Sequence, residues 1–243
     1  GISTYYRRET DGTLSVKLEG ELHDVPLFEQ LAVLRECALY DTWAPFCHDS
    51  RRLKQLGRID FVGWFLVNCG FVVRDCVYRS VGCDCMMEDG SVMLVAEGIG
   101  RDGAGFLSRG VPETVDLPPV PRGFNSGRMH IKSFQGVLDV LGVSSVRTRL
   151  VANIDPCLNF IPQSFINFCM KKMCGVLLNK LQRAAVRIIR DPIENEHARQ
   201  MRRESAFYRL WLLPKFKAYC DKLGWKMPHV AALQTEQPWE WAG

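Results

Sequence analysis

The stretch that most constrains the fold of this chain runs from Ile161 to Ile189. Pro162 suits the first turn of a helix, where its missing N–H group leaves no hydrogen bond unmade. Such a helix is about 40 Å long at 1.5 Å per residue, and its other face is too polar for it to cross a bilayer. Apolar residues recur at helical spacing along one face: Ile166, Met170, Met173, Leu177, Leu181, Ala184 and Ile188. The pattern predicts one dominant amphipathic helix that covers another layer of the structure.

The composition is that of a globular chain. It has 243 residues, of which 47% are hydrophobic and 24% are charged. These fractions are typical of a soluble protein, and the length allows a sizeable core in one or two domains. We recognise neither a signal peptide nor an apolar run long enough to span a membrane. We therefore expect a cytoplasmic protein, and the missing initiator Met fits a fragment of a longer chain.

The cysteines favour reduced thiols over a metal site. There are 10 of them, and no two form a Cys-x-x-Cys pair. Most fall in apolar strands or helices, which is typical of buried thiols in a cytosolic protein. Cys83 and Cys85 point the same way on a predicted strand, but no third and fourth ligand is near in sequence. Because a zinc site needs such a set, we predict neither a metal nor a cofactor.

Alternating and β-branched segments separated by turn residues predict an antiparallel sheet. The predicted strands are Ile2–Arg8, Leu14–Leu22, Asp60–Val67, Phe71–Val81, Ser91–Gly98, Met129–Leu141 and Val146–Ile154. A short helix is predicted at Pro26–Ala38, a polar turn at Cys47–Arg52, and a long loop rich in Gly and Pro at Ile99–Arg128. This order indicates the α+β class, with a curved antiparallel sheet wrapped around the long C-terminal helix.

Four segments, taken in order, resemble one family. They are Gly1–Arg7 with Val16–Gly20, Tyr40–Phe46, Arg74–Tyr78, and the run from Thr148 through Asp155-Pro156 and Ile161-Pro162 to Asn167. Their order and spacing resemble the START domains, the StAR-related lipid-transfer family. The resemblance implies a helix-grip fold, in which a U-shaped antiparallel sheet grips the final helix around a lipid cavity. It covers residues 1–190, without the family's N-terminal helix, and leaves residues 191–243 as a basic, Trp-containing helical extension.

The resemblance implies non-enzymatic binding and intracellular transfer of a single lipid in an internal hydrophobic cavity. Apolar lipid surface gains roughly 25 cal/mol per Å² when it leaves water, and a few polar groups fix the headgroup. The candidate cavity residues are Phe61, Trp64, Tyr78, Ser80, Met93, His130, Arg149, Ile166, Met170, Met173 and Leu177. In the family a loop over the mouth moves with the final helix. Here Ile99–Arg128 takes that place, with Phe106, Leu107 and Leu117 as gate and membrane residues.

The residues that recognise a headgroup in known relatives do not carry over to this chain. Phe61 stands where the sterol type has an acid, and Tyr40 stands where the phosphatidylcholine type has an arginine. Ser80 stands where the family often has a second strand arginine, and Arg79 lies one step away, on the other face of the strand. The ligand class therefore stays open among phospholipid, sterol and sphingolipid-like molecules.

Two other classes of function stay open. The bulky Phe61, Trp64 and Met93 fit a scaffold or regulatory module whose cavity is filled by side chains. An enzyme acting on a hydrophobic substrate needs a reactive group held by a partner, and the same fold hosts some cyclases and hydrolases. The 5 histidines are scattered, and we find no Ser-His-Asp order. We therefore predict no catalytic residues, although His130 could face the cavity from its strand.

Basic residues gather in the C-terminal third of the chain, although the net charge is only +4. Residues 171–226 hold 14 Lys and Arg against 5 Asp and Glu. This excess suggests a transient partner such as an anionic membrane surface, while a solvated helix face is the plainer alternative. No nucleic-acid recognition motif is present, so we predict no nucleic-acid partner.

The extension itself predicts a helix at Asp191–Leu213, kinked at Pro214 and continued to Leu223. Its apolar stripe consists of Met201, Tyr208, Trp211 and Leu212. The stripe favours docking on the grip domain. A basic, Trp-bearing helix also suits a membrane interface or a protein partner for residues 191–243.

Overall fold

The computed structural model describes residues 1–70, 72–100, 105–157 and 163–233, with side chains in the last range from residue 176 onward. Nine strands form one curved sheet in the order β1-β2-β9-β8-β6-β5-β4-β3, with β7 paired beside β5. The strands are β1 Ile2–Arg8, β2 Leu14–His23, β3 Cys47–Gly57, β4 Asp60–Asn68, β5 Val73–Cys85, β6 Ser91–Gly98, β7 Ser126–Arg128, β8 His130–Gly142 and β9 Ser145–Asp155. The helices are α1 Leu27–Arg35, α2 Gln163–Arg190, α3 Glu196–Arg203, α4 Ser205–Phe207 and α5 Leu213–Lys222.

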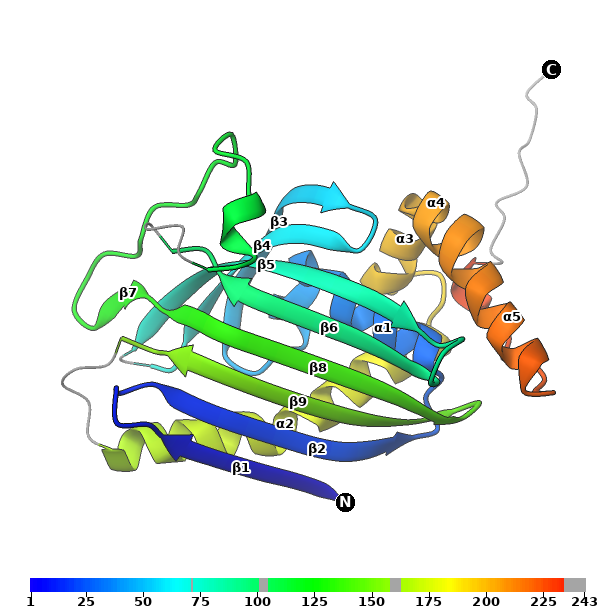
Figure 1. Cartoon of the computed structure of the whole chain (residues 1–243), viewed down its shortest axis with the longest axis horizontal. Coiled ribbons are helices and arrows are strands. Elements are labelled where there is room, and N and C mark those ends of the chain that lie inside the picture. The colour runs from blue at the N-terminus through cyan, green and yellow to red at the C-terminus, as the bar shows by residue number, and fades with distance from the viewer. Residues whose placement is uncertain (71, 101–104, 158–162, 234–243) are drawn as a thin grey trace.

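The long helix α2 lies across one face of the sheet, together with α1 (Figure 1). Its described inner face is fully buried at Leu178, Ala185 and Ile188. The helix comes so close to β2 that a Cβ atom at Gly20 would lie 2.9 Å from Leu178 Cδ1, and glycine is the residue that permits such an approach. The sheet and its covering helix confirm the predicted α+β helix-grip architecture.

No described helix is long and apolar enough to cross a membrane. The predicted helix over Ile161–Ile189 is confirmed as α2, within two residues at its start. The side chains of Ile166, Met170 and Met173 lie outside the described residues, so their place in the core stays a prediction.

One predicted turn is wrong. The segment Cys47–Arg52 is not a polar turn but the first half of strand β3, which forms the edge of the sheet beside β4. Its sequence is rich in charged residues and its pairing with β4 is interrupted by register shifts. Edge strands commonly carry charges and bulges because these features discourage pairing with other chains. The polar composition of this strand is therefore the reason why the sequence predicted a turn.

The C-terminal extension docks on the grip fold, as its apolar stripe predicts. Phe207, Tyr208 and Phe216 lie in the same buried cluster as Phe28 of α1. The division of the chain after residue 190 into separate domains stays a prediction.

The first helix of the extension begins later than predicted, and the predicted kink at Pro214 is not present. Helix α3 starts at Glu196, where the Asn195 side chain accepts hydrogen bonds from the N–H groups of His197 and Ala198 and so caps the helix. Pro214 does not break the second segment. It follows a π turn at Tyr208–Leu212 and sits in the first turn of α5, where a proline is tolerated.

A carboxyl group with one unpaired oxygen is buried in α1. Glu29 is 3% exposed, and its Oε2 atom has no hydrogen-bond partner among the described residues. Burial raises the pKa of Glu29 from 4.5 to about 7. The folded chain therefore holds this proton more tightly than the unfolded chain, and the free energy of unfolding falls as the pH rises from 4.5 through about 7.

Replacing Glu29 by Gln should remove this loss of stability. At pH 8 the free energy of unfolding of the variant should be roughly 3 kcal/mol higher than that of the wild type, because one pKa unit corresponds to about 1.4 kcal/mol and the pKa of Glu29 rises from 4.5 to about 7 on folding. At about pH 4.5, below the folded pKa, the two proteins should be equally stable. Denaturant titrations at both pH values measure the difference, and an equal pH dependence in the two proteins would contradict the assignment.

Candidate functional site

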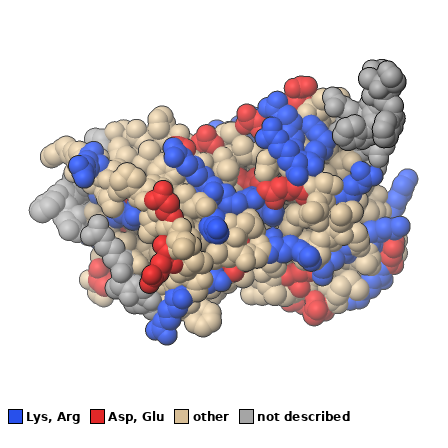
Figure 2. Space-filling view, turned by 90° about the horizontal axis from the view of Figure 1, so that it is seen from above, with Lys and Arg blue, Asp and Glu red and all other residues tan. Residues whose placement is uncertain are grey.

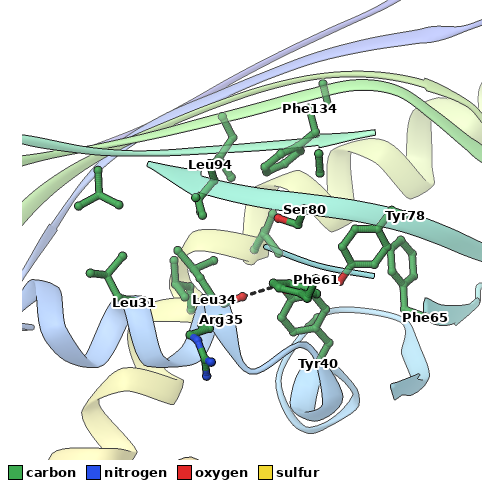
Figure 3. Close-up of a pocket in the computed structure, with 18 of the residues that line it drawn as sticks. Leu31, Leu34, Arg35, Tyr40, Phe61, Phe65, Tyr78, Ser80, Leu94 and Phe134 are labelled. Atoms are coloured by element: carbon green, nitrogen blue, oxygen red, sulfur yellow. Dashed lines mark hydrogen bonds between the residues drawn. The ribbon is translucent and has the colours of Figure 1, made fainter. Parts of the chain in front are cut away.

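A cavity of about 350 Å³ lies between the sheet and the helices that cover it. Its walls come from β2, β4, β5, β6, β8 and β9 on one side and from α1, α2 and the extension on the other. Figure 3 shows side chains from both sides pointing into the same space. Apolar residues make up most of the lining, among them Leu18, Leu31, Leu34, Phe65, Leu94, Phe134, Leu150, Ala152 and Leu178.

Successive side chains of a strand point to opposite faces of the sheet, and this alternation largely decides which residues line the cavity. On β4 and β5 most lining residues are spaced by even numbers of positions, such as Phe61 and Phe65, or Tyr78 and Ser80, and Cys83 near the end of β5 is the exception among the described residues of the two strands. Tyr78 is directly opposite Gly63 in the pairing of the two strands. A Cβ atom at Gly63 would lie 2.7 Å from the Tyr78 hydroxyl oxygen, so the absence of a side chain there lets the tyrosine ring lie across the sheet.

The cavity contains one buried hydroxyl group without a partner. The Tyr78 side chain is 5% exposed, and its hydroxyl has no hydrogen-bond partner among the described residues. Burial raises the pKa of Tyr78 well above its ordinary value, so the group is a neutral phenol. The neighbouring Tyr40 hydroxyl, by contrast, donates to the Leu34 carbonyl oxygen at 2.6 Å. The Ser80 hydroxyl lies on the same strand as Tyr78, two positions further on (Figure 3).

The charges beside the cavity neutralise one another. Arg35 lines the cavity, and its guanidinium lies 2.6 Å from Glu36 Oε1 and 2.5 Å from Glu204 Oε2. Arg52 joins the same two carboxylates, at 2.6 Å from Glu36 and 2.5 Å from Glu204. The Tyr208 hydroxyl donates a further hydrogen bond to Glu36. We call Arg35, Glu36, Arg52 and Glu204 the Arg–Glu cluster.

The adjacent Arg74 and Asp75 have structural partners. Arg74 donates to the carbonyl oxygens of Pro156 at 2.8 Å and Asn125 at 2.6 Å, which ties down the ends of two loops. Asp75 is fully buried and pairs with Arg128 at 2.5 Å. Neither side chain lines the cavity. Among the described residues, no group of three or more His, Cys, Asp or Glu is placed to hold a metal ion.

The structure brings four of the candidate residues together in the cavity wall: Phe61, Tyr78, Ser80 and Leu177. Three others lie on the opposite face of the sheet, because each is an odd number of positions from a lining residue on its strand. Trp64 donates to Asp75 Oδ2 at 2.9 Å, Met93 is 38% exposed, and Arg149 pairs with Asp139 at 2.8 Å. These three positions are corrections to the predicted wall.

His130 is the first residue of β8 and does not line the cavity, although the next residue, Ile131, does. Strand alternation again explains the difference. The structure therefore gives no support for His130 as a group that faces a ligand. Ile166, Met170 and Met173 have no described side chains, and their contact with a ligand stays a prediction.

The described part of the long loop covers the outer face of the sheet and not the cavity. Val115 lies in a buried cluster with Val62 and Val77, on the face that points away from α2. The Leu107 carbonyl oxygen accepts a hydrogen bond from Arg79 at 2.9 Å, and its N–H donates to Glu97 at 2.7 Å.

The three gate residues of the loop do not reach the cavity. None of Phe106, Leu107 and Leu117 lines it. Phe106 is 86% exposed and Leu117 is 41% exposed, so both remain available for contact with another surface. Their role as gate or membrane residues stays a prediction.

Sequence reasoning missed the contribution of the extension to the wall. Phe207, Trp211 and Leu212 line the cavity at the end where α4 and the π turn lie. The stripe of Tyr208, Trp211 and Leu212 predicted docking but not the surface on which the residues would dock. Long-range placement of this kind is not encoded in local periodicity.

Trp64 offers a test of the two faces of β4. Trp64→Phe removes the indole N–H group that donates a hydrogen bond to Asp75, while most of the apolar contact is kept. We expect the free energy of unfolding to fall by about 1–2 kcal/mol, as for the loss of a hydrogen bond to a charged group. Binding of any cavity ligand should be unchanged. Denaturation and ligand titration of the variant measure the two quantities, and weakened binding without loss of stability would place Trp64 in the cavity instead.

Solved structures with a similar fold include three START proteins. Human STARD10 superposes with a TM-score of 0.60 at 14% identity, over 96% of this chain and 82% of that one. Human StAR-related lipid transfer protein 5 gives 0.57 at 15% identity, over 78% and 84% of the two chains. A STAR-related lipid transfer protein fragment from Xanthomonas axonopodis gives 0.54 at 18% identity, over 76% and 93%. The chain therefore has a START-like fold. No family model matches the sequence, and no curated protein matches it.

Proposed function

We propose that this chain binds one lipid-like molecule in the central cavity and carries it between membranes without chemical change. The observation that carries the proposal is the apolar cavity of about 350 Å³ between the sheet and the long helix. Cavities of about 300–1,000 Å³ with a few polar groups are typical of sites for small molecules. The START-like fold, seen in two proteins named for lipid transfer, supports the same function.

We further propose that the buried end of the ligand is uncharged. Two charged side chains, Arg35 and Asp84, line the cavity in the described part of the chain. Arg35 is held in the Arg–Glu cluster, and Asp84 pairs with Lys215 at 2.7 Å. Among the described residues a phosphate group at this depth would lack a free cation, and burial of an unpaired charge is costly. The Tyr78 hydroxyl suits a hydroxyl or carbonyl group of the ligand.

Native mass spectrometry of the protein expressed in a lipid-rich host tests the proposal. We expect one lipid bound per chain and extraction of labelled lipid from vesicles by the purified protein. The competing account is a scaffold whose fold no longer holds a ligand. An absence of bound lipid, together with no extraction from vesicles, would favour the scaffold and overturn the proposal.

An anionic membrane surface is the proposed place of exchange. Lys180, Arg183 and Arg187 are exposed on the polar side of α2. Lys and Arg also gather toward the end of the molecule that carries the C-terminal helices, with Asp and Glu among them (Figure 2). Each cation near such a surface contributes about 1 kcal/mol, within a Debye length of about 8 Å. The proposal is one of transient, peripheral contact.

Reversing the charge of Lys180, Arg183 and Arg187 to Glu should weaken binding to anionic vesicles and leave binding to neutral vesicles nearly unchanged. The reason is that the three side chains are exposed, so their removal affects surface attraction more than folding. Vesicle sedimentation at low salt measures both affinities. Equal binding of the unaltered chain to anionic and neutral vesicles would exclude the electrostatic contribution.

A further inference from the structure

Two cysteines on the outer face of β5 lie close enough to react with each other. The Sγ atoms of Cys83 and Cys85 are 3.6 Å apart, and Cys83 is exposed. Cys83 borders the cavity, but both residues are an odd number of positions from the lining residues Ser80 and Gly82, so strand alternation places their side chains on the opposite face of β5 from those two. The proposed lipid binding requires no reaction of these two thiols.

A disulfide between them would bend the strand. Residues two apart on a strand have Cα atoms about 6.6 Å apart, whereas disulfides prefer a Cα separation of about 5.5–6 Å and an S–S bond of about 2.05 Å. Closing the 3.6 Å gap between the sulfur atoms therefore shortens the outer face of the strand. A strand shortened on one face curls toward that face, so the end of the β5–β6 hairpin would move outward.

Helix α5 lies beside the end of the same hairpin (Figure 1). Asp84, which lies between the two cysteines, pairs with Lys215 of α5 at 2.7 Å. Lys222 donates to the Met87 carbonyl oxygen at 2.6 Å. These contacts join α5 to the hairpin and depend on its position relative to the helix.

We propose that Cys83 and Cys85 form a reversible disulfide that loosens α5 from the β5–β6 hairpin. The site is a peroxide-sensitive pair of thiols, and its effect passes through Asp84, the residue between them. Formation of the disulfide and its effect on α5 do not depend on the nature of a ligand in the cavity.

The chemistry balances with a peroxide as the oxidant. The Cys83 thiolate attacks one oxygen of hydrogen peroxide, the O–O bond breaks, and a sulfenic acid and water form after proton transfer. The Cys85 sulfur then attacks the sulfenic sulfur, an S–S bond forms, and a second water leaves. Cys83 is the more exposed thiol of the two, which fits it as the one that reacts first. A dithiol reductant reverses the step by thiol–disulfide exchange.

Peptide mapping of the full chain tests the first half of the proposal. Trypsin releases the peptide Ser80–Arg101, which contains Cys83 and Cys85 and no other cysteine. After brief treatment with dilute hydrogen peroxide and alkylation, we expect this peptide to lack two hydrogen atoms and both alkyl groups. Treatment with dithiothreitol should restore alkylation of both residues. Full alkylation after peroxide, while other cysteines of the same sample are oxidised, would overturn the proposal.

Hydrogen exchange of the α5 amides, from Leu213 to Lys222, tests the second half. We expect several-fold faster exchange in the oxidised chain, and no effect of peroxide on α5 in a Cys83→Ser variant. A Lys215→Met variant should show the faster exchange without oxidant, because it removes the contact with Asp84. Formation of the disulfide with unchanged exchange in α5 would overturn the proposed coupling.

Discussion

Replacing Glu36 by Gln should lower the free energy of unfolding by about 3–5 kcal/mol, the range found when one partner of a buried ion pair is removed. The Glu36 side chain is 1% exposed and lies 2.6 Å from both Arg35 and Arg52. Without its charge, two guanidinium groups share the single carboxylate of Glu204 in a site largely shielded from water. Because the cluster joins α1, β3 and α4, the loss should affect the docking of the extension as well as the core.

Glu21 provides the matched control for this prediction. It also pairs with an arginine, Arg147, at 2.8 Å, but both side chains are well exposed, at 38% and 42%. Glu21→Gln should therefore change stability little, since exposed ion pairs are weak and screened by salt. Denaturant titration of both variants measures the contrast. Equal effects of the two substitutions would show that burial of the Arg–Glu cluster does not stabilise the fold.

Filling the cavity should abolish lipid binding. Ala152 lies on β9, is 8% exposed and lines the cavity. Ala152→Trp places an indole ring in the space proposed for the ligand, so we expect lipid extraction from vesicles to fall at least about tenfold, equivalent to about 1.4 kcal/mol. The cost in stability should stay below about 3 kcal/mol, the upper range for overpacking, because the ring enters an existing cavity.

A control variant at the adjacent residue distinguishes a filled cavity from a damaged strand. Val151 is 49% exposed on the opposite face of β9. Val151→Trp introduces the same ring one position away, and we expect it to leave lipid extraction unchanged. Comparable loss in both variants would contradict the location of the site, and normal extraction by Ala152→Trp would contradict the cavity itself.

The parts of the fold that follow local patterns could be predicted from the sequence. Strand β1 was predicted with its observed bounds, Ile2–Arg8, because its residues favour strands and a turn residue pair follows it. The amphipathic period defined α2 almost to the residue. Strand β3 was missed because an edge strand with register shifts lacks an apolar alternation.

The wall of the cavity could be predicted only in part. Phe61, Tyr78 and Ser80 were found because the resemblance aligned their strands, while Trp64 and Met93 were placed in the wall without regard to strand alternation. A count of positions from Phe61 would have placed Trp64 on the outer face. The lining residues from the extension, Phe207 and Trp211, required knowledge of how distant elements meet.

The Arg–Glu cluster could not be predicted either. Its members are separated by up to 169 positions, from Arg35 to Glu204, and each alone is an ordinary charged residue. Their pairing depends on the docking of α4 beside α1 and β3. The sequence carries no local signal for such an arrangement, because complementary charges are recognisable as partners only when the fold brings them together.

The most direct measurement of the central claim is to locate the bound lipid by photolabelling. A lipid with a diazirine in its acyl chain, bound to the purified chain and activated by light, should attach to residues that line the cavity, such as Leu94, Phe134 and Leu150. Peptide sequencing by mass spectrometry distinguishes these positions from their neighbours on the outer face. Labels on cavity residues are the predicted result, and labels confined to outer positions such as Met93 and Val151 would contradict the account.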